Sequence, residues 1–459
     1  MPELLTDTQV SHIEKNQAPD SKTLDKIAAT TKAYHDQLLQ TLKEMVAIPS
    51  VKDEPAEDAP YGLACKRALD YFVEKTKSMG FMAKNVDNRA AYAEFGKGEK
   101  LVAVACHLDV VPAGDGWSQD PFTLTEIDDG FVSARGVADD KGPALAVLYA
   151  MKALMDEGYE PPCRIRLIVG ADEENGSSCL QHYAKTQEIP ASGFTADAEF
   201  PAVFAEKGHL GIILHRDRVA SPKDLYLVRA EAGKALNMVP GICKYRLSDG
   251  EDHVVEGKQA HASMPQNGVN AIQKAFVEIF EACGPKANHV IDLFHNLMGT
   301  ETDGKSMGIA CEDASGALTL NVGTLKITED EVRIGIDIRY PITKKGPEIV
   351  EKIREAVDKY GFTIAECDDS APLDLGENSD LVTSLMKAYN EVCQTKAKAV
   401  AIGGGTYARA LPNICAFGMQ FPGDPDCMHQ ANEFAEKRRI FAAMAIYKEA
   451  LKNLAALYA

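Results

Sequence analysis

The sequence has 459 residues, of which 45% are hydrophobic and 25% are charged, values typical of a folded enzyme. They exclude a disordered, collagenous or coiled-coil protein. The 68 Asp and Glu residues outnumber the 49 Lys and Arg residues, and the net charge is −19. Since such a surface repels nucleic acid and anionic membranes, we expect neither as a partner. The length favours two compact units.

The eleven cysteines are scattered, and no C-x-x-C pair occurs that would indicate a zinc knuckle or a thioredoxin-type site. Free cysteines in a chain of this size are typical of cytosolic proteins, so we expect a cytoplasmic location. The N-terminal residues lack the basic and apolar regions of a secretion signal. No stretch reaches the roughly 18 apolar residues that a membrane helix needs.

Predicted helices and strands alternate in the first part of the chain. Residues 1–22 are polar and are expected to form a peripheral extension. Apolar residues then recur with helical spacing, and two short apolar runs are typical of buried strands. This alternation indicates an α/β unit with a mostly parallel sheet. The predicted elements are helices over residues 22–47, 61–79 and 142–157 and strands over residues 101–106 and 164–169.

The middle of the chain has a different pattern, in which strands predominate and helices are few. This pattern is typical of a separate α+β domain whose helices lie on one face of a sheet. The strands are predicted over residues 210–215, 225–229, 242–247, 317–327 and 331–340, and the helices over residues 271–282 and 347–359.

The C-terminal part returns to the α/β pattern. Its predicted elements are helices over residues 379–392 and 431–457 and strands over residues 397–402 and 414–418. The simplest fold is an α/β domain with a mostly parallel sheet and flanking helices, formed by residues 1–206 and 372–459. An inserted α+β domain, residues 207–371, interrupts it.

His107 and Asp109 directly follow the buried strand over residues 101–106. Because side chains alternate along a strand, both would point the same way. In many metal sites one imidazole nitrogen binds the ion while a carboxylate orients the ring. Taken alone, a His-x-Asp sequence at a strand end is more often a turn or a surface pair.

Acidic residues lie in three further segments. Asp139 directly precedes a predicted helix, where a carboxylate could instead be an ordinary N-cap. Glu173 and Glu174 follow the strand over residues 164–169, and a solvated turn is the alternative there. Asp197 lies in the sequence DAEFP. In an open parallel sheet, sites gather at the carboxyl ends of the strands, which favours a common site.

Together these segments supply enough ligands for a metal centre. Two imidazoles and three carboxylates suit a divalent ion such as zinc, with manganese or cobalt as alternatives. Their spread over five segments suggests two ions that share one carboxylate. The candidate ligands are His107, Asp139, Glu174, Asp197 and His429.

Seven motifs occur in an order that resembles the co-catalytic metallopeptidase superfamily of aminoacylase, carboxypeptidase G, carnosinase and bacterial PepV-type dipeptidases. They are HLDVVPAGDGW, RGVADDKGP, DEENGSS, DAEFP, HASMPQNGVNA, DIRYP and MHQANE. The similarity runs from about residue 37 to the C-terminus. The PepV-type branch is most similar, because of DAEFP, the segment 237–240 and the size of the insert. The resemblance implies a catalytic α/β domain and an inserted lid domain.

The resemblance also implies a role for each candidate ligand. His107, Asp139 and Asp197 would bind one metal ion. Glu174 and His429 would bind the second ion, and Asp139 would bridge the two.

Two neighbouring carboxylates would have other roles by the same resemblance. Glu173 would be the general base that takes a proton from the water between the ions and returns it to the leaving amine. Asp109 would orient His107. The peptide bond between Asp139 and Asp140 would be cis.

His261 lies in the insert, where the sequence alone favours a structural residue in the turn before a helix. The resemblance instead implies that it stabilises negative charge on the carbonyl oxygen of the scissile bond. Asn237 resembles a family residue that binds the C-terminal carboxylate of the substrate.

Arg339 resembles the second family residue that binds this carboxylate, since a guanidinium can bind it with two parallel hydrogen bonds. It could instead pair with Asp337 or Asp368. The backbone N–H groups of Gly404 and Gly405 could bind the same carboxylate, although a simple tight turn is equally consistent with the glycine run.

These observations predict a cytoplasmic metallodipeptidase that binds two divalent ions and hydrolyses small dipeptides. We expect an active monomer, because the insert is long enough to supply His261 within one chain; the alternative is a symmetric dimer. A deacylase or desuccinylase acting on N-acyl amino acids would use the same chemistry. A non-catalytic peptide- or metal-binding protein is the third possibility, and the intact Glu173 argues against it.

Overall fold

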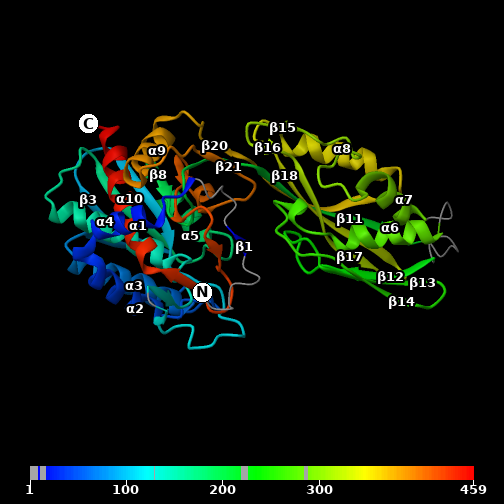
Figure 1. Cartoon of the computed structure of the whole chain (residues 1–459), viewed down its shortest axis with the longest axis horizontal. Helices are drawn as coiled ribbons and strands as arrows, with labels where there is room; N and C mark the ends of the chain where they lie inside the picture. The colour runs from blue at the N-terminus through cyan, green and yellow to red at the C-terminus, as the bar shows by residue number, and fades with distance from the viewer. Residues whose placement is uncertain (1–8, 11–16, 129, 219–225, 284–287) are drawn as a thin grey trace. The chain divides into compact units, whose positions relative to one another are not determined.

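The protein is described here from a computed structural model that covers residues 9–10, 17–128, 130–218, 226–283 and 288–459 (Figure 1). The chain folds as two compact units. The first contains Met1–Phe204, Leu375–Val400 and Thr406–Ala459, and the second contains Ala205–Asp374 and Ala401–Gly405. Gly404 and Gly405 therefore group with the second unit, whereas the expected boundaries placed them in the α/β domain.

The first unit is built on a sheet whose central strands are parallel. Strand β4 pairs in parallel with β7 and β8, and β8 pairs in parallel with β22. All seven residues of β4 are buried, which explains its continuous apolar sequence. The strand order is β2 (Met82–Val86), β3 (Ala90–Gly96), β7 (Arg164–Gly170), β4 (Leu101–His107), β8 (Ser192–Thr195), β22 (Ile414–Ala416), β10 (Val203–Glu206) and β20 (Leu373–Asp374), and β21 (Val400–Ile402) also pairs with β10.

Helices flank this sheet, as predicted. Helix α4 is almost wholly buried, because it packs between α2, α10 and the sheet. The helices of the first unit are α1 (Ser21–Ala29), α2 (His35–Val46), α3 (Leu63–Ser78), α4 (Lys141–Asp156), α5 (Ser178–Thr186), α9 (Asp380–Cys393) and α10 (Lys437–Ala456).

Two helix predictions were wrong in their bounds. The single helix predicted over residues 22–47 is two helices, since the hydroxyls of Thr30 and Thr31 bond back to the carbonyls of Ile27 and Ala28 at 2.7 and 3.0 Å. The predicted start of the last helix, residue 431, is also wrong. Phe434–Glu436 instead forms strand β25, which pairs with β6 (Phe131–Ser133), and α10 follows it.

The second unit contains one antiparallel sheet of seven strands. Apolar residues of its central strands pack with those of α6 (Ala271–Cys283) and α8 (Gly346–Asp358) in one core, which confirms the α+β pattern. Figure 1 shows these helices alongside the sheet. The strand order is β14 (Asp252–Glu256), β13 (Ile242–Leu247), β12 (Leu227–Ala232), β17 (Thr319–Ile327), β18 (Glu331–Tyr340), β11 (Gly208–Asp217) and β19 (Thr363–Ser370).

Shorter elements complete the two units. The predicted N-terminal extension lies largely outside the described residues, but β1 (Gln9–Val10) pairs with β24 (Pro425–Asp426). Among the described residues, no helix is both long and apolar enough to cross a membrane. The remaining elements are β5 (Thr125–Asp128), β9 (Ala198–Glu199), β23 (Met419–Gln420), β15 (Glu312–Asp313), β16 (Gly316–Ala317), α7 (His289–Leu293) and single turns over Lys32–Tyr34, Pro265–Asn267, Phe294–Met298 and Tyr407–Ala410.

Candidate metal centre

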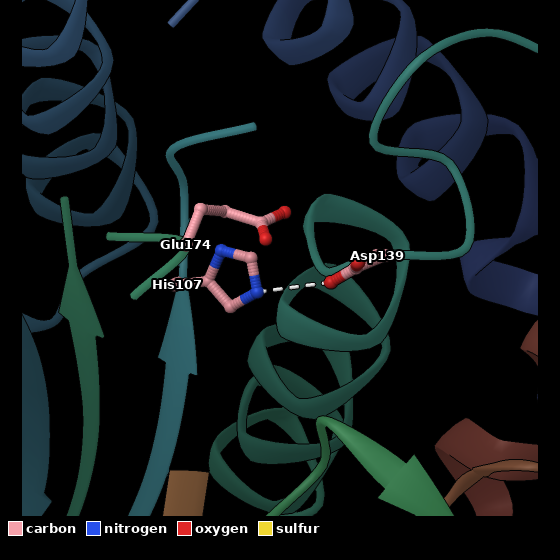
Figure 2. Close-up of side chains that lie close together, drawn as sticks. All are labelled: His107, Asp139 and Glu174. Carbon is pink, nitrogen blue, oxygen red and sulfur yellow. Dashed lines mark hydrogen bonds and ion pairs between the residues drawn. The ribbon is translucent and has the colours of Figure 1, made fainter. Parts of the chain in front are cut away.

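Three of the predicted ligands, His107, Glu174 and Asp197, lie where strands of the sheet in the first unit end. His107 is the last residue of β4, and Glu174 lies in the turn after β7. Asp139 precedes α4, and Asp197 lies between β8 and β9. Because β4, β7 and β8 are parallel neighbours, their carboxyl ends meet at one edge. Figure 2 shows three of these side chains, His107, Asp139 and Glu174, directed toward one another.

The carboxylate of Asp139 lies between two imidazoles. Its Oδ1 is 2.9 Å from Nε2 of His107, and its Oδ2 is 2.8 Å from Nε2 of His429. His429 also approaches Oε2 of Glu174 at 3.1 Å. Each oxygen of Asp139 thus faces a different histidine, the arrangement expected of a carboxylate shared by two ions.

The remaining candidates lie in the same cluster. Oδ2 of Asp197 is 3.8 Å from Nε2 of His107. Ligand atoms of His107, Glu173 and Asp197 all lie within 4.8 Å of one another, as do those of His107, Asp139 and Glu174. The structure therefore brings together all five predicted ligands and the predicted base.

The charges of this cluster fit a cation. Among the described residues, no Lys or Arg pairs with Asp139, Glu173, Glu174 or Asp197. Oε1 of Glu174 is buried and accepts no hydrogen bond from the residues that the structure describes. Converging carboxylates repel one another unless a positive charge compensates them, and mixed imidazole and carboxylate ligands suit zinc, manganese or cobalt.

Burial has a strong effect on the ionisation of these side chains. It raises the pKa of Glu173 to about 7, with the neighbouring carboxylates of Glu174 and Asp139 adding to the effect. It also raises the pKa of Asp197 well above its usual value. Hydrogen bonds to Asp139 and Glu174 raise the pKa of His429 to about 10. These shifts show that the cluster without a cation takes up protons, whereas a bound cation would favour the ionised carboxylates and the neutral imidazole.

Asp109 holds both the ring of His107 and the turn after β7. Nδ1–H of His107 donates to the backbone carbonyl of Asp109 at 2.9 Å, and the Asp109 carboxylate lies 3.6 Å from the same nitrogen. That carboxylate accepts the backbone N–H groups of Glu173 and Glu174 at 3.1 and 3.2 Å. The carbonyl thus orients the ring more closely than the carboxylate, and Nε2 is left toward Asp139.

The peptide bond between Asp139 and Asp140 is cis, as the family resemblance implied. No separate role was predicted for Asp140, whose side chain is fully buried. Its Oδ2 accepts the backbone N–H of His107 at 2.9 Å, and burial raises its pKa to about 8. Asp140 thereby fixes the end of β4, and the only signal for it in the sequence is its place beside Asp139.

The predicted substrate-binding residues lie in the second unit, where contacts connect several of them. The carbonyl of Asn237 accepts the N–H of Ala262 at 3.0 Å, next to His261. Nδ1 of His261 accepts the N–H of Ser263 at 3.2 Å and lies 2.7 Å from the hydroxyl oxygen of Ser263, an arrangement that favours the neutral tautomer with its proton on Nε2. Nη1 of Arg339 donates to the carbonyl of Gly403, directly before Gly404 and Gly405, at 3.4 Å.

Arg339 pairs with Asp337, one of the alternatives that its sequence context left open. Nε and Nη2 of Arg339 donate to the two oxygens of Asp337 at 2.7 and 2.9 Å. His209, on the neighbouring strand β11, approaches the same carboxylate at 2.9 Å. Asp337 therefore lies between two basic side chains.

With this geometry established, comparison with known proteins decides the family. Residues 103–453 match the family model described as "Peptidase family M20/M25/M40". The chain belongs to this peptidase family. It is a peptide hydrolase, as its motifs predicted. Over 457 residues it is 36% identical to the Bacillus subtilis (strain 168) protein named "Putative dipeptidase YtjP", with 92% of this chain and 97% of that protein covered.

Two solved structures show the same fold for this family member. The structure of human carnosine dipeptidase 1 matches with a TM-score of 0.56 at 16% identity, covering 94% of this chain and 100% of that one. The Bacillus subtilis protein YXEP, described as a dinuclear metal binding peptidase, matches with a TM-score of 0.51 at 11% identity, covering 92% and 98%. Both agree with the predicted α/β architecture.

Proposed function

We propose that this M20 family member is a PepV-type dipeptidase that hydrolyses free dipeptides with the help of two divalent metal ions. One observation carries the proposal: the two oxygens of Asp139 face two different imidazoles, inside a cluster of carboxylates that no Lys or Arg of the described residues neutralises. The similarity to a relative named as a dipeptidase, over nearly the whole chain, supports the substrate class.

In the first unit, five side chains would bind the metal ions and a sixth would transfer the proton. His107, Asp139 and Asp197 would hold one ion, and Glu174 and His429 would complete the second site with Asp139. Zinc fits this donor set first, with manganese or cobalt as alternatives. When bound, such ions lower the pKa of water and polarise a carbonyl group.

Glu173 would accept the proton of the attacking water and return it to the leaving amine. The bond that breaks is the C–N bond of the peptide, so one carboxylate and one amine are formed. Asp109 keeps the base in place, because its carboxylate accepts the backbone N–H of Glu173. A general base must lie within hydrogen-bond reach of the proton that it takes, so a fixed backbone at Glu173 favours this role.

The second unit would serve as the lid domain and bind the substrate. Nε2–H of His261 is a suitable donor to the carbonyl oxygen as negative charge develops on it. The guanidinium of Arg339, with Asn237 and the N–H groups of Gly404 and Gly405, would bind the C-terminal carboxylate.

Metal analysis combined with a substrate panel tests this function. Purified protein should contain two divalent ions per chain, and protein stripped by a chelator should regain activity with zinc, manganese or cobalt. It should cleave α-L-dipeptides or β-alanyl dipeptides much faster than N-acetyl or N-succinyl amino acids. Preference for the acylated substrates would assign the chain to the deacylases, and metal binding without any hydrolysis would make it a binding protein.

We further propose a cytoplasmic, active monomer in which His261 acts within its own chain. The test mixes two inactive variants, Glu173→Ala and His261→Ala. Activity should stay absent on mixing if His261 acts in its own chain, whereas recovery of activity would show that it acts on a partner chain. Cell fractionation tests the location.

A further inference from the structure

Glu433 has no assigned role, although it lies four residues after His429 in the MHQANE motif. Its side chain is fully buried, with 0% exposed. The Glu433 carboxylate contacts residues 135–139, the loop that precedes α4 and lies nearly 300 residues earlier in the chain. A buried carboxylate is costly unless hydrogen bonds and a positive charge compensate it, so its contacts show what keeps it there.

The carboxylate of Glu433 accepts hydrogen bonds from four donors in this loop. Oε1 accepts the backbone N–H groups of Gly136, Ala138 and Asp139 at 3.1, 2.8 and 3.2 Å. Oε2 accepts Nη1–H of Arg135 at 2.7 Å. Gly136 has a φ of 89°, which lets its N–H join the others around one oxygen. Glu433 therefore holds the backbone of Asp139 itself.

The segment that carries Glu433 is fixed at several other points. The side-chain oxygen of Asn432 accepts the N–H and the hydroxyl of Ser118, both at 2.8 Å. The carbonyl of Glu433 accepts the hydroxyl of Ser133 at 2.7 Å. His429 and Asn432 have φ values of 62° and 60°, in the left-handed region that residues other than glycine adopt uncommonly.

We propose that Glu433 is a positioning residue that sets the spacing between the carboxylate of Asp139 and the imidazole of His429. His429 is 54% exposed, so packing alone does not fix its ring. Glu433 ties the segment of His429 to the loop of Asp139 by bonds that share one carboxylate. Loss of these bonds should weaken metal binding about 10–100-fold, the usual effect of residues that orient metal ligands. This inference rests on the proposed metal centre.

The alternative is that Glu433 only neutralises Arg135 and contributes to stability. The first unit offers a matched control in Glu94 and Arg166, a second buried pair. Nε of Arg166 donates to Glu94 at 2.7 Å, and Nη1 donates to Tyr183 at 2.6 Å. Glu94 lies on β3, and in the described part of the chain it pairs with Arg166 and Arg164 rather than with any candidate ligand. Glu94→Gln therefore removes a comparable buried charge away from the metal centre.

The experiment compares wild type, Glu433→Gln and Glu94→Gln by zinc and manganese titration calorimetry and by thermal unfolding. Both variants should unfold at lower temperature than wild type, because each leaves a buried Arg without its partner. Only Glu433→Gln should bind metal more weakly, by at least about 10-fold for one ion. A neutral amide oxygen accepts about two hydrogen bonds, so it cannot replace the carboxylate.

A second variant keeps the test valid if Glu433→Gln does not fold. The double variant Arg135→Met with Glu433→Gln carries no unpaired buried charge and should regain stability. Its metal affinity should stay low, because the three backbone N–H groups still lack their acceptor. The inference is overturned if Glu433→Gln or the double variant binds metal with wild-type affinity. It is also overturned if Glu94→Gln loses as much affinity as Glu433→Gln. Failure of wild type to bind metal would instead refute the proposed function on which it rests.

Discussion

Two clusters of charged side chains, one in each unit, differ in their balance of acidic and basic groups. In the first unit, the carboxylates of Asp139, Glu174 and Asp197 meet two imidazoles and no Lys or Arg of the described residues. In the second unit, the buried carboxylate of Asp337 lies between His209 and Arg339. Although burial acts to raise the pKa of Asp337, the hydrogen bonds from these two side chains hold it below its usual value.

This difference in charge indicates which kind of ion each cluster could bind. Excess carboxylates at the end of a parallel sheet need a cation, because without one they repel each other. A guanidinium and an imidazole that share one carboxylate keep donors for an additional anion, and a guanidinium has five N–H donors in all. In the proposed function, the first cluster would bind metal ions and the second would bind the carboxylate of the substrate. Substitutions in each cluster should accordingly have different kinds of effect.

The largest effect is expected for Asp139→Ala, which should abolish activity and reduce both metal sites. The reason is that each of its oxygens faces a different imidazole. His429→Ala, the matched control, should weaken mainly one ion. Metal content per chain, measured by mass spectrometry after dialysis, separates the two outcomes. Equal losses in both variants would show that Asp139 does not bridge two ions.

The next effect is expected for Glu173→Ala, which should lower kcat about 10²–10⁴-fold, the usual contribution of a general base. All five predicted ligands remain, so the metal content should stay near that of wild type. Steady-state kinetics and metal analysis on the same preparation test this. A variant that keeps more than about a tenth of wild-type kcat would contradict the assignment of Glu173 as base.

Much of the fold followed from the sequence because buried elements carry periodic apolar residues. The strands β13 and β18 have the predicted bounds, and buried β4 followed from its apolar run. Strand β19 was not predicted, since most of its residues are exposed and polar. Such a strand is held by backbone pairing with β11, which leaves little pattern in its own side chains.

In the candidate site, too, some residues could be predicted from the sequence and others could not. His107 and Glu174 could be predicted because each closely follows a recognisable strand, and the family motifs then related them to one another. Asp140 and Glu433 were not predicted, because they act on backbone N–H groups. A backbone N–H is present at nearly every position, so no residue type marks the partner. Only the folded chain shows that Glu433 meets the loop of Asp139.

A smaller effect is expected in the second unit for Arg339→Lys. Lysine cannot reproduce the paired bonds of a guanidinium, so KM for a dipeptide should rise about 10–100-fold while the metal content stays unchanged. A dipeptide amide is the matched control substrate, since it lacks the C-terminal carboxylate. The variant should change its KM little. An equal rise for both substrates would show that Arg339 serves the fold of the second unit through Asp337 rather than the substrate.

The smallest effect is expected at Glu44, an ordinary surface carboxylate outside both clusters. It accepts hydrogen bonds from Gln40 at 2.8 Å, from Tyr71 and from Lys75 at 2.9 Å, and these lower its pKa to about 2. Glu44→Gln should reduce the free energy of unfolding by about 1 kcal/mol or less at pH 7, because the site is solvated.

The pH dependence of this small difference has a defined sign. A carboxyl group with a lowered pKa stabilises the folded state above its unfolded pKa, about 4.3 for Glu, and this contribution is lost as the pH falls toward about 2. Urea unfolding of wild type and Glu44→Gln at pH 7 and pH 3 should therefore show that their difference in free energy of unfolding shrinks at the lower pH. A difference that grows on acidification would mean that Glu44 is not stabilised as a carboxylate.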